Sequence, residues 1–139
     1  MSEEARTDIQ ALSEDEARRL LQHGAFVGRV GFVQGGRPRI VPVNYLAERP
    51  DSIVFCSVEG SKLAALAGGA PVVFEVDDLR PLYHAGWSVV AHGTAAEVTD
   101  ERELDALRRG PLRSWAAPRG GRWIRISVEE VSGRRIPEH

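Results

Sequence analysis

The sequence has one cysteine and one lysine among its 139 residues, and it lacks any long apolar run. A single cysteine, Cys56, excludes an intramolecular disulfide and favours a reducing compartment. No stretch approaches the roughly 20 apolar residues that a membrane-spanning helix needs. The acidic start at residues 1–5 has no apolar core of the kind found in signal peptides. We therefore expect a cytoplasmic protein.

Several functional motifs are also missing. The sequence contains no HExxH or CxxC spacing for a metal, no GxSxG for a hydrolase, and no Walker or Rossmann glycine pattern. The formal net charge is −2, without a basic face or tail, so nucleic acid is not an expected partner. With 42% hydrophobic and 27% charged residues, the chain has the composition of one globular domain.

Six β-rich segments and three short helices follow from the residue patterns. Hairpin-like spacing early in the chain and the absence of a βαβ rhythm favour a mainly β fold, with an antiparallel sheet closed into a small barrel. We expect residues 1–11 to form a flexible arm and residues 12–139 to form a single domain. The expected strands are 25–33, 39–45, 53–58, 71–77, 87–98 and 122–128; the expected helices are 13–24, 62–67 and 100–110.

Local signals mark the ends of these elements. Ser13 with Glu16, and Asp100 with Glu103, have the spacing of capping boxes at helix starts. Gly35-Gly36 predicts a tight hairpin turn. In the long fifth segment, a bend is expected at Gly93.

Gly60-Ser61-Lys62 stands at the expected start of a short helix, directly after a strand. Unpaired backbone N–H groups at a helix start carry partial positive charge, and an ammonium beside them makes an anion site. Phosphate is the common ligand of such sites. The pattern indicates a ligand with a phosphate group, against the alternative that Lys62 is a solvated surface residue.

Pro42 interrupts an otherwise regular strand pattern. Proline cannot donate to a ladder, so it marks an edge, a bulge or a break in pairing. A break would leave neighbouring backbone groups available to a ligand.

Three further residues invite comment. Glu75 lies in an apolar strand and needs a partner; we expect Arg134 or Arg135, with a catalytic acid as the alternative. Cys56 is expected to be a small buried side chain, and Trp123 a core residue.

Taken in order, these segments resemble the FMN-binding split-barrel proteins, the pyridoxamine 5′-phosphate oxidase-like superfamily. The likeness covers roughly residues 12–136 and is nearest to the small bacterial flavin-binding members. The matching segments are VGRV (27–30), RPRIVPVNY (37–45), IVFCS (53–57) with GSKL (60–63), VFEVD (73–77), GWSVVAHG (86–93) and SGRRI (132–136).

The resemblance implies a six-stranded antiparallel split β-barrel with peripheral helices, and a homodimer with FMN at the subunit interface. The resemblance assigns phosphate binding to Ser57, Ser61 and Lys62, and places Arg39 near the ribityl-phosphate. It places Pro42, Val43 and Asn44 beside the isoalloxazine ring. Trp87 and Ser88 would reach the flavin from the partner subunit.

The implied activity is an FMN-dependent oxidoreductase for a small planar or electrophilic substrate, with no catalytic side chain identified, since the flavin carries the redox chemistry. Three alternatives stay open. They are a flavin carrier or sensor without turnover, a deazaflavin-dependent reductase that uses an arginine groove (residues 108, 109, 113, 119 and 122), and a structural dimer without a ligand. His92 stands where relatives often carry arginine, which bears on the ligand's identity.

Overall fold

The computed structural model describes residues 9–23, 27–57, 65–66, 68–80, 82, 85–110 and 121–137. These residues form one antiparallel sheet of seven strands, in the order β1-β7-β4-β3-β2-β5-β6, and β6 pairs back onto β7 to close a barrel. Two helices accompany the sheet in this part of the chain. The elements are β1 (Gln10–Ala11), α2 (Glu14–His23), β2 (Val27–Gln34), β3 (Arg37–Arg49), β4 (Ser52–Ser57), β5 (Gly68–Arg80), β6 (Ala85–Glu97), α4 (Glu101–Arg108) and β7 (Arg122–Ile136).

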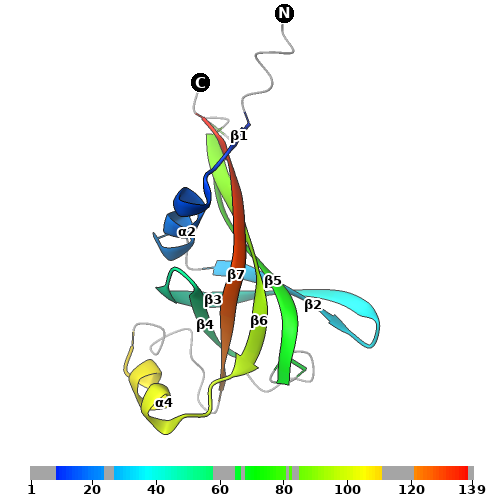
Figure 1. The fold of residues 1–139 in the computed structure, drawn as a ribbon, viewed down its shortest axis with the longest axis vertical. Helices are drawn as coiled ribbons and strands as arrows, with labels where there is room; N and C mark the ends of the chain where they lie inside the picture. Colours follow the sequence, from blue (N-terminus) through cyan, green and yellow to red (C-terminus); the bar gives the residue numbers. More distant parts are fainter. Residues whose placement is uncertain are drawn as a thin grey trace, which may run out of the picture.

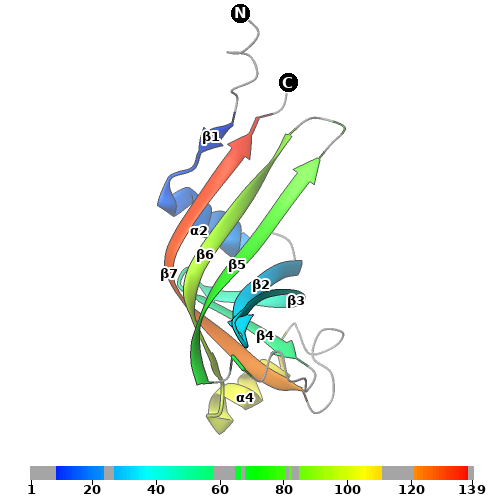
Figure 2. The ribbon, with the colours of Figure 1, turned by 90° about the vertical axis from the view of Figure 1, so that its right-hand side faces the viewer.

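The predicted fold class, a mainly β split barrel with peripheral helices, is confirmed. Strands β5, β6 and β7 lie side by side along the long axis of the molecule, and β2, β3 and β4 cross them (Figures 1 and 2). Helix α2 packs beside β7 and β3, while α4 lies at the opposite end of the barrel (Figure 1). The six expected strands are present, and β1 joins them as a two-residue strand.

Apolar side chains fill the barrel in the pattern that strand alternation dictates. In β2, Val30 and Phe32 point inward and are buried, whereas Arg29 is exposed, as predicted. A second, smaller cluster lies outside β4 and contains Trp123 and Cys56. The predictions of a core tryptophan and of a buried cysteine are both confirmed, since their relative exposures are 3% and 8%.

Most of the predicted helix caps and turns are present. Ser13 and Glu16 form the reciprocal capping box, with both backbone-to-side-chain distances 3.1 Å. Gly35 and Gly36 turn the β2–β3 hairpin with φ angles of 58° and 76°, which fits a type I′ turn. At α4 only half of the predicted box forms.

Asp100 caps α4 by accepting a hydrogen bond from the backbone N–H of Glu103 at 3.1 Å. The sequence predicted that the Glu103 side chain would also accept a hydrogen bond from the backbone N–H of Asp100, and this bond is not formed. The Glu103 side chain accepts instead from Arg125 on β7 at 2.6 Å, because a guanidinium across the gap gives a charge-assisted bond that a backbone N–H cannot match.

Strands β3, β5 and β7 extend well beyond their predicted bounds. β7 continues past its predicted end at residue 128 through residues 129–136, because β6 pairs along nearly its whole length. The predicted bend at Gly93 is confirmed as a bulge: His92 faces Glu130 and Gly93 faces Val128, which leaves Glu129 as the extra residue. The last residues of the predicted arm, Gln10–Ala11, pair with β7 as β1.

Two predicted segments lie partly outside the described residues. They are the short helix at 62–67, of which only residues 65–66 are described, and the start of the first strand at 25–26. Neither helix in the described part of the chain has the length and apolarity required to cross a membrane. Within the same residues, no group of three or more histidine, cysteine, aspartate or glutamate side chains is placed to hold a metal ion.

Candidate functional site

The pairing between β3 and β4 stops partway along both strands. Tyr45 lies opposite Phe55, and the register runs from there only toward Arg49 and Ser52. The rest of β3, residues 37–44, pairs with β2 on one side. Its other edge has no neighbouring strand in the part of the chain that the structure describes. The barrel is split at this point.

Pro42 lies on this open edge. It stands opposite Arg29 in an unbroken register with β2, so the predicted edge is confirmed and a bulge or break in this pairing is excluded. An unbroken ladder requires the proline nitrogen to point away from the paired strand. Because backbone groups alternate between the two edges of a strand, Asn44 also directs its N–H and C=O to the open edge, while Val43 directs its own toward Gly28.

The predicted site residues on β3 and β4 lie beyond the last pair of these two strands, Tyr45 with Phe55. Val43 is 8% exposed: its side chain joins the barrel core, and its backbone groups are directed toward β2. Asn44 is half-buried. Ser57, the last residue of β4, is 7% exposed and sits opposite Arg122 of β7, at the same end of the two strands as Asn44. Ser61 and Lys62 lie outside the described residues.

Three other predicted residues lie apart from the split. Arg39 is exposed on β3, opposite Phe32 and close to the hairpin. Trp87 and Ser88 are half-buried on β6, which is separated from β3 by two strands in either direction around the barrel. Trp87 packs against the core, and Ser88 lines a pocket of about 530 Å³ together with residues of β1 and β7. One chain therefore does not bring these two residues to the open edge of β3.

The sequence reasoning missed a charged cluster beside Pro42. Arg29 of β2 lies in register between Pro42 and Glu75 of β5. Its NH1 is 3.0 Å from the Glu75 carboxylate and 3.3 Å from Asp77. Glu75 is therefore paired with Arg29, and the expectation of Arg134 or Arg135 is wrong. Local spacing gives no signal for this contact, because it depends on the register of strands 46 residues apart.

Burial raises the pKa of Glu75 to about 7, and the neighbouring Asp77 carboxylate adds to this effect, while Arg29 opposes it. Burial likewise raises the pKa of the Cys56 thiol to about 11. A thiol that stays protonated at neutral pH is a poor nucleophile, so the structure gives Cys56 a packing role.

Exposed aliphatic side chains gather on the outer face of the same strands. Strand alternation puts them on the side that carries Arg29 and Glu75, away from the core. Their relative exposures run from 43% to 68%. They are Val27, Val33, Ile40 and Leu79.

Comparison with known proteins shows the family to which this chain belongs. The family model for pyridoxamine 5′-phosphate oxidase matches residues 13–135, and the chain therefore belongs to that family. An uncharacterized protein of Mycobacterium tuberculosis, Rv0080, is 33% identical over 139 residues, covering 97% of this chain and 90% of its own.

Two solved structures share the fold over nearly their whole length. The FAD-binding protein of Mycobacterium smegmatis has a TM-score of 0.77 and 31% identity, covering 94% of this chain and 100% of its own. An FAD-binding protein of Mesorhizobium loti has a TM-score of 0.76 and 25% identity, covering 93% and 99%. The split-barrel resemblance indicated by the sequence motifs is thus confirmed.

Proposed function

We propose that this protein is a flavin-dependent oxidoreductase that binds FMN along the open edge of β3. The observation that carries the proposal is the end of the β3–β4 pairing at Tyr45 and Phe55, which leaves the backbone edge at Pro42 and Asn44 without a strand partner among the described residues. The pyrimidine end of an isoalloxazine ring presents N–H and C=O groups in a row. It can therefore bond an exposed strand edge as another strand would.

The residues present at the split fit such a ligand. Asn44 would supply its backbone N–H and C=O, and Pro42 its C=O, to the ring edge. Ser57 stands at the end of β4, where Ser61 and Lys62 follow in the sequence, and these three would hold the phosphate. Arg39 would approach the ribityl-phosphate from the hairpin side. Val43 would hold this part of β3 in place, because its side chain packs in the barrel core.

The identity of the flavin is the finer part of the proposal. The relatives from Mycobacterium smegmatis and Mesorhizobium loti are described as FAD-binding proteins. FMN and FAD share the isoalloxazine ring, the ribityl chain and the first phosphate, so the split can hold this part of either molecule. A lysine with two serines fits the terminal phosphate of FMN, which carries more charge than a phosphodiester.

We further propose that the active form is a homodimer. The exposed aliphatic residues of the outer face would be covered by a second copy, which would remove their apolar surface from water. Trp87 and Ser88 lie across the barrel from the split, so they would reach the flavin of the partner subunit. An aromatic ring there would stack on or edge the isoalloxazine.

The bound flavin would supply two-electron redox chemistry at its ring. The residues around the split would then orient a small planar or electrophilic substrate and exclude water. No nucleophilic side chain is assigned, which agrees with the burial of Cys56.

Titration with FMN, followed by quenching of flavin fluorescence, tests the site. Lys62→Ala should weaken FMN binding at least tenfold, because it removes a charge-assisted bond to phosphate. The matched control is Arg102→Ala, an exposed cation on α4, which should leave the affinity unchanged. Equal affinities for wild type and Lys62→Ala, or no binding at all, would contradict the proposed site.

A further inference from the structure

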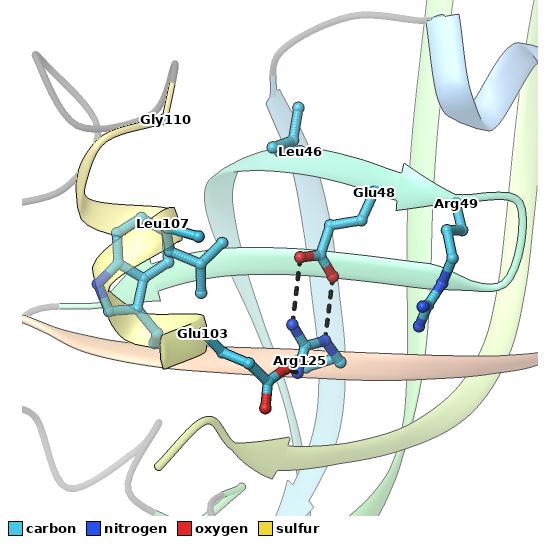
Figure 3. Close-up of a pocket in the computed structure, with 9 residues that line it drawn as sticks. Leu46, Glu48, Arg49, Glu103, Leu107, Gly110 and Arg125 are labelled. Carbon is cyan, nitrogen blue, oxygen red and sulfur yellow. Dashed lines mark hydrogen bonds and ion pairs between the residues drawn. The ribbon is translucent and has the colours of Figure 1, made fainter. Parts of the chain in front are cut away.

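A second cavity lies on the outside of the barrel, between α4 and the strands β3 and β7 (Figure 3). Its volume is about 380 Å³, near the lower end of the roughly 300–1,000 Å³ typical of small-molecule sites. None of its lining residues belongs to the proposed flavin site. It is therefore a separate feature of the fold, and its chemistry can be considered independently of the flavin.

The inner part of this cavity is apolar. Leu46 of β3, Leu107 of α4 and Trp123 of β7 line it, and they belong to the small cluster outside β4. Trp123 and Leu107 are almost completely buried, with exposures of 3% and 7%, so the floor is fixed by packing. Such a floor suits the face of a flat ring system.

The polar part of the cavity is built around one guanidinium. Arg125 donates from Nε and NH2 to the two oxygens of Glu48, at 3.0 and 3.1 Å, and from NH1 to Glu103 at 2.6 Å (Figure 3). Ser52 also donates to Glu48, at 2.9 Å. Burial opposes ionisation of Glu48, but the bonds from Arg125 and Ser52 outweigh it and hold its pKa below the usual range. The pair therefore stays charged and in place.

This network leaves hydrogen-bonding capacity at the cavity. Arginine has five N–H groups, and the contacts to Glu48 and Glu103 use three of those of Arg125. One oxygen of Glu103 bonds Arg125, while the other has no partner within the described residues, and the side chain is 46% exposed. An acceptor and a donor thus stand next to each other above an apolar floor.

The charges of the lining residues cancel, because Arg49 joins Arg125 opposite the two glutamates. An ion of either sign gains little from such a site. A neutral, planar nitrogen heterocycle with an N–H donor beside a ring-nitrogen acceptor matches both the floor and the rim. We propose that this cavity is a binding site for a nucleobase, with the base lying on Leu46 and Leu107 and its polar edge bonded to Glu103 and Arg125.

A nucleobase can reach the cavity from two sources, a free nucleoside or the adenine end of a bound FAD. Adenosine is the probe that tests the shared chemistry, added to the full-length protein and followed by calorimetry. Wild type should bind it, and Glu103→Gln should weaken binding at least fivefold by removing the acceptor charge. Glu101→Gln, an exposed glutamate on the same helix outside the cavity, should bind as wild type does.

Ala106→Phe provides the second variant, because Ala106 lines the cavity from the exposed side of α4, and a phenyl ring there occupies the space without altering the core. It should abolish adenosine binding while leaving the melting temperature within a few degrees of wild type. If the source is FAD, Ala106→Phe should also weaken FAD at least tenfold relative to FMN. If the source is a free nucleoside, the two flavin affinities should be unchanged. Absence of adenosine binding to wild type, or equal binding to Ala106→Phe, overturns the proposal and leaves the flavin site unaffected.

Discussion

Arg29 on β2 and Glu75 on β5 are cross-strand neighbours on the outer face of the barrel, with NH1 of the arginine 3.0 Å from Oε1 of the glutamate. Asp77 accepts from the same nitrogen at 3.3 Å. One cation thus serves two carboxylates that are each about a quarter to a third exposed. Burial raises the pKa of Glu75 to about 7, and competition with the Asp77 carboxylate for the same guanidinium adds to this effect.

This raised pKa makes stability depend on pH in a definite direction. Folded Glu75 keeps its proton up to about pH 7, whereas the unfolded carboxyl loses it near its ordinary value of 4.5. Between these values the folded state binds more protons, so the free energy of unfolding falls as pH rises. Glu75→Gln removes this contribution. Its unfolding free energy relative to wild type should therefore increase by about 1 kcal/mol from pH 4.5 to 7, after allowance for solvent screening.

Urea unfolding followed by tryptophan fluorescence at several pH values measures the difference. Asp77→Asn supplies a second test. Loss of the neighbouring carboxylate lowers the folded-state pKa of Glu75, so the pH range over which Glu75 affects stability becomes narrower. Parallel pH curves for wild type and Glu75→Gln would contradict this account.

Gly93 should not tolerate a side chain. A Cβ at this position would lie 2.1 Å from the backbone oxygen of Ser127, and a backbone atom inside a paired strand has little freedom to move away. We expect Gly93→Ala to lower the unfolding free energy by about 1–3 kcal/mol, as is typical of overpacked buried sites. Gly68→Ala is the control, because no atom lies within 4 Å of a Cβ there. Equal melting temperatures for the two variants would show that the bulge relaxes.

Arg125 should be a stabilising residue because it joins β7 to β3 and to α4. Arg125→Met leaves Glu48 half-buried and unpaired, which should cost about 2 kcal/mol at pH 7. The pKa of Glu48 is held low in the folded protein, so its contribution is present above its usual value and is lost as the carboxyl protonates at lower pH. The difference between wild type and Arg125→Met should therefore shrink below about pH 4.

Arg49→Met is the comparison for this prediction. Arg49 is 69% exposed and its nearest carboxylate, on Asp51, is 3.6 Å away, so its loss should change stability by less than about 0.5 kcal/mol. Chemical denaturation at pH 3, 5 and 7 measures both variants. A similar loss for the two arginines at pH 7 would show that the Arg125 network contributes nothing specific.

Cys56 should resist thiol reagents in the native state. Its side chain is 8% exposed, and burial raises its pKa to about 11, so little thiolate is present at pH 8. We expect the reaction with a disulfide reagent to be at least about 100-fold slower in native protein than in urea-unfolded protein. Comparable rates in the two states would mean that β4 opens readily.

The features that the sequence could predict are those that depend on neighbours in the chain. The Ser13–Glu16 cap, the Gly35-Gly36 turn and the alternation of β2 all follow from local chemistry, and all three are present. Strand ends were predicted too short because polar residues such as Asp78 and Arg80 remain in a strand when a neighbouring strand pairs with them. Neighbouring strands supply that pairing, and single-sequence patterns do not contain it.

The candidate site divides in the same way. Pro42 marks a strand edge through its own covalent structure, so its placement was predictable. The partner of Glu75 was not, since it depends on how β2 and β5 align. The cavity beneath α4 gave no sequence signal either, because Glu48, Glu103 and Arg125 come from three distant segments and are brought together only by folding.

The absorption spectrum of the purified protein tests the central claim most directly. If the open edge of β3 holds a flavin, the protein should be yellow as isolated or become so with added FMN. It should then show the two visible flavin bands, and the chromophore released on denaturation should have the mass of FMN. A colourless protein whose spectrum does not change with FMN or FAD, and which leaves flavin fluorescence unquenched, would contradict the account.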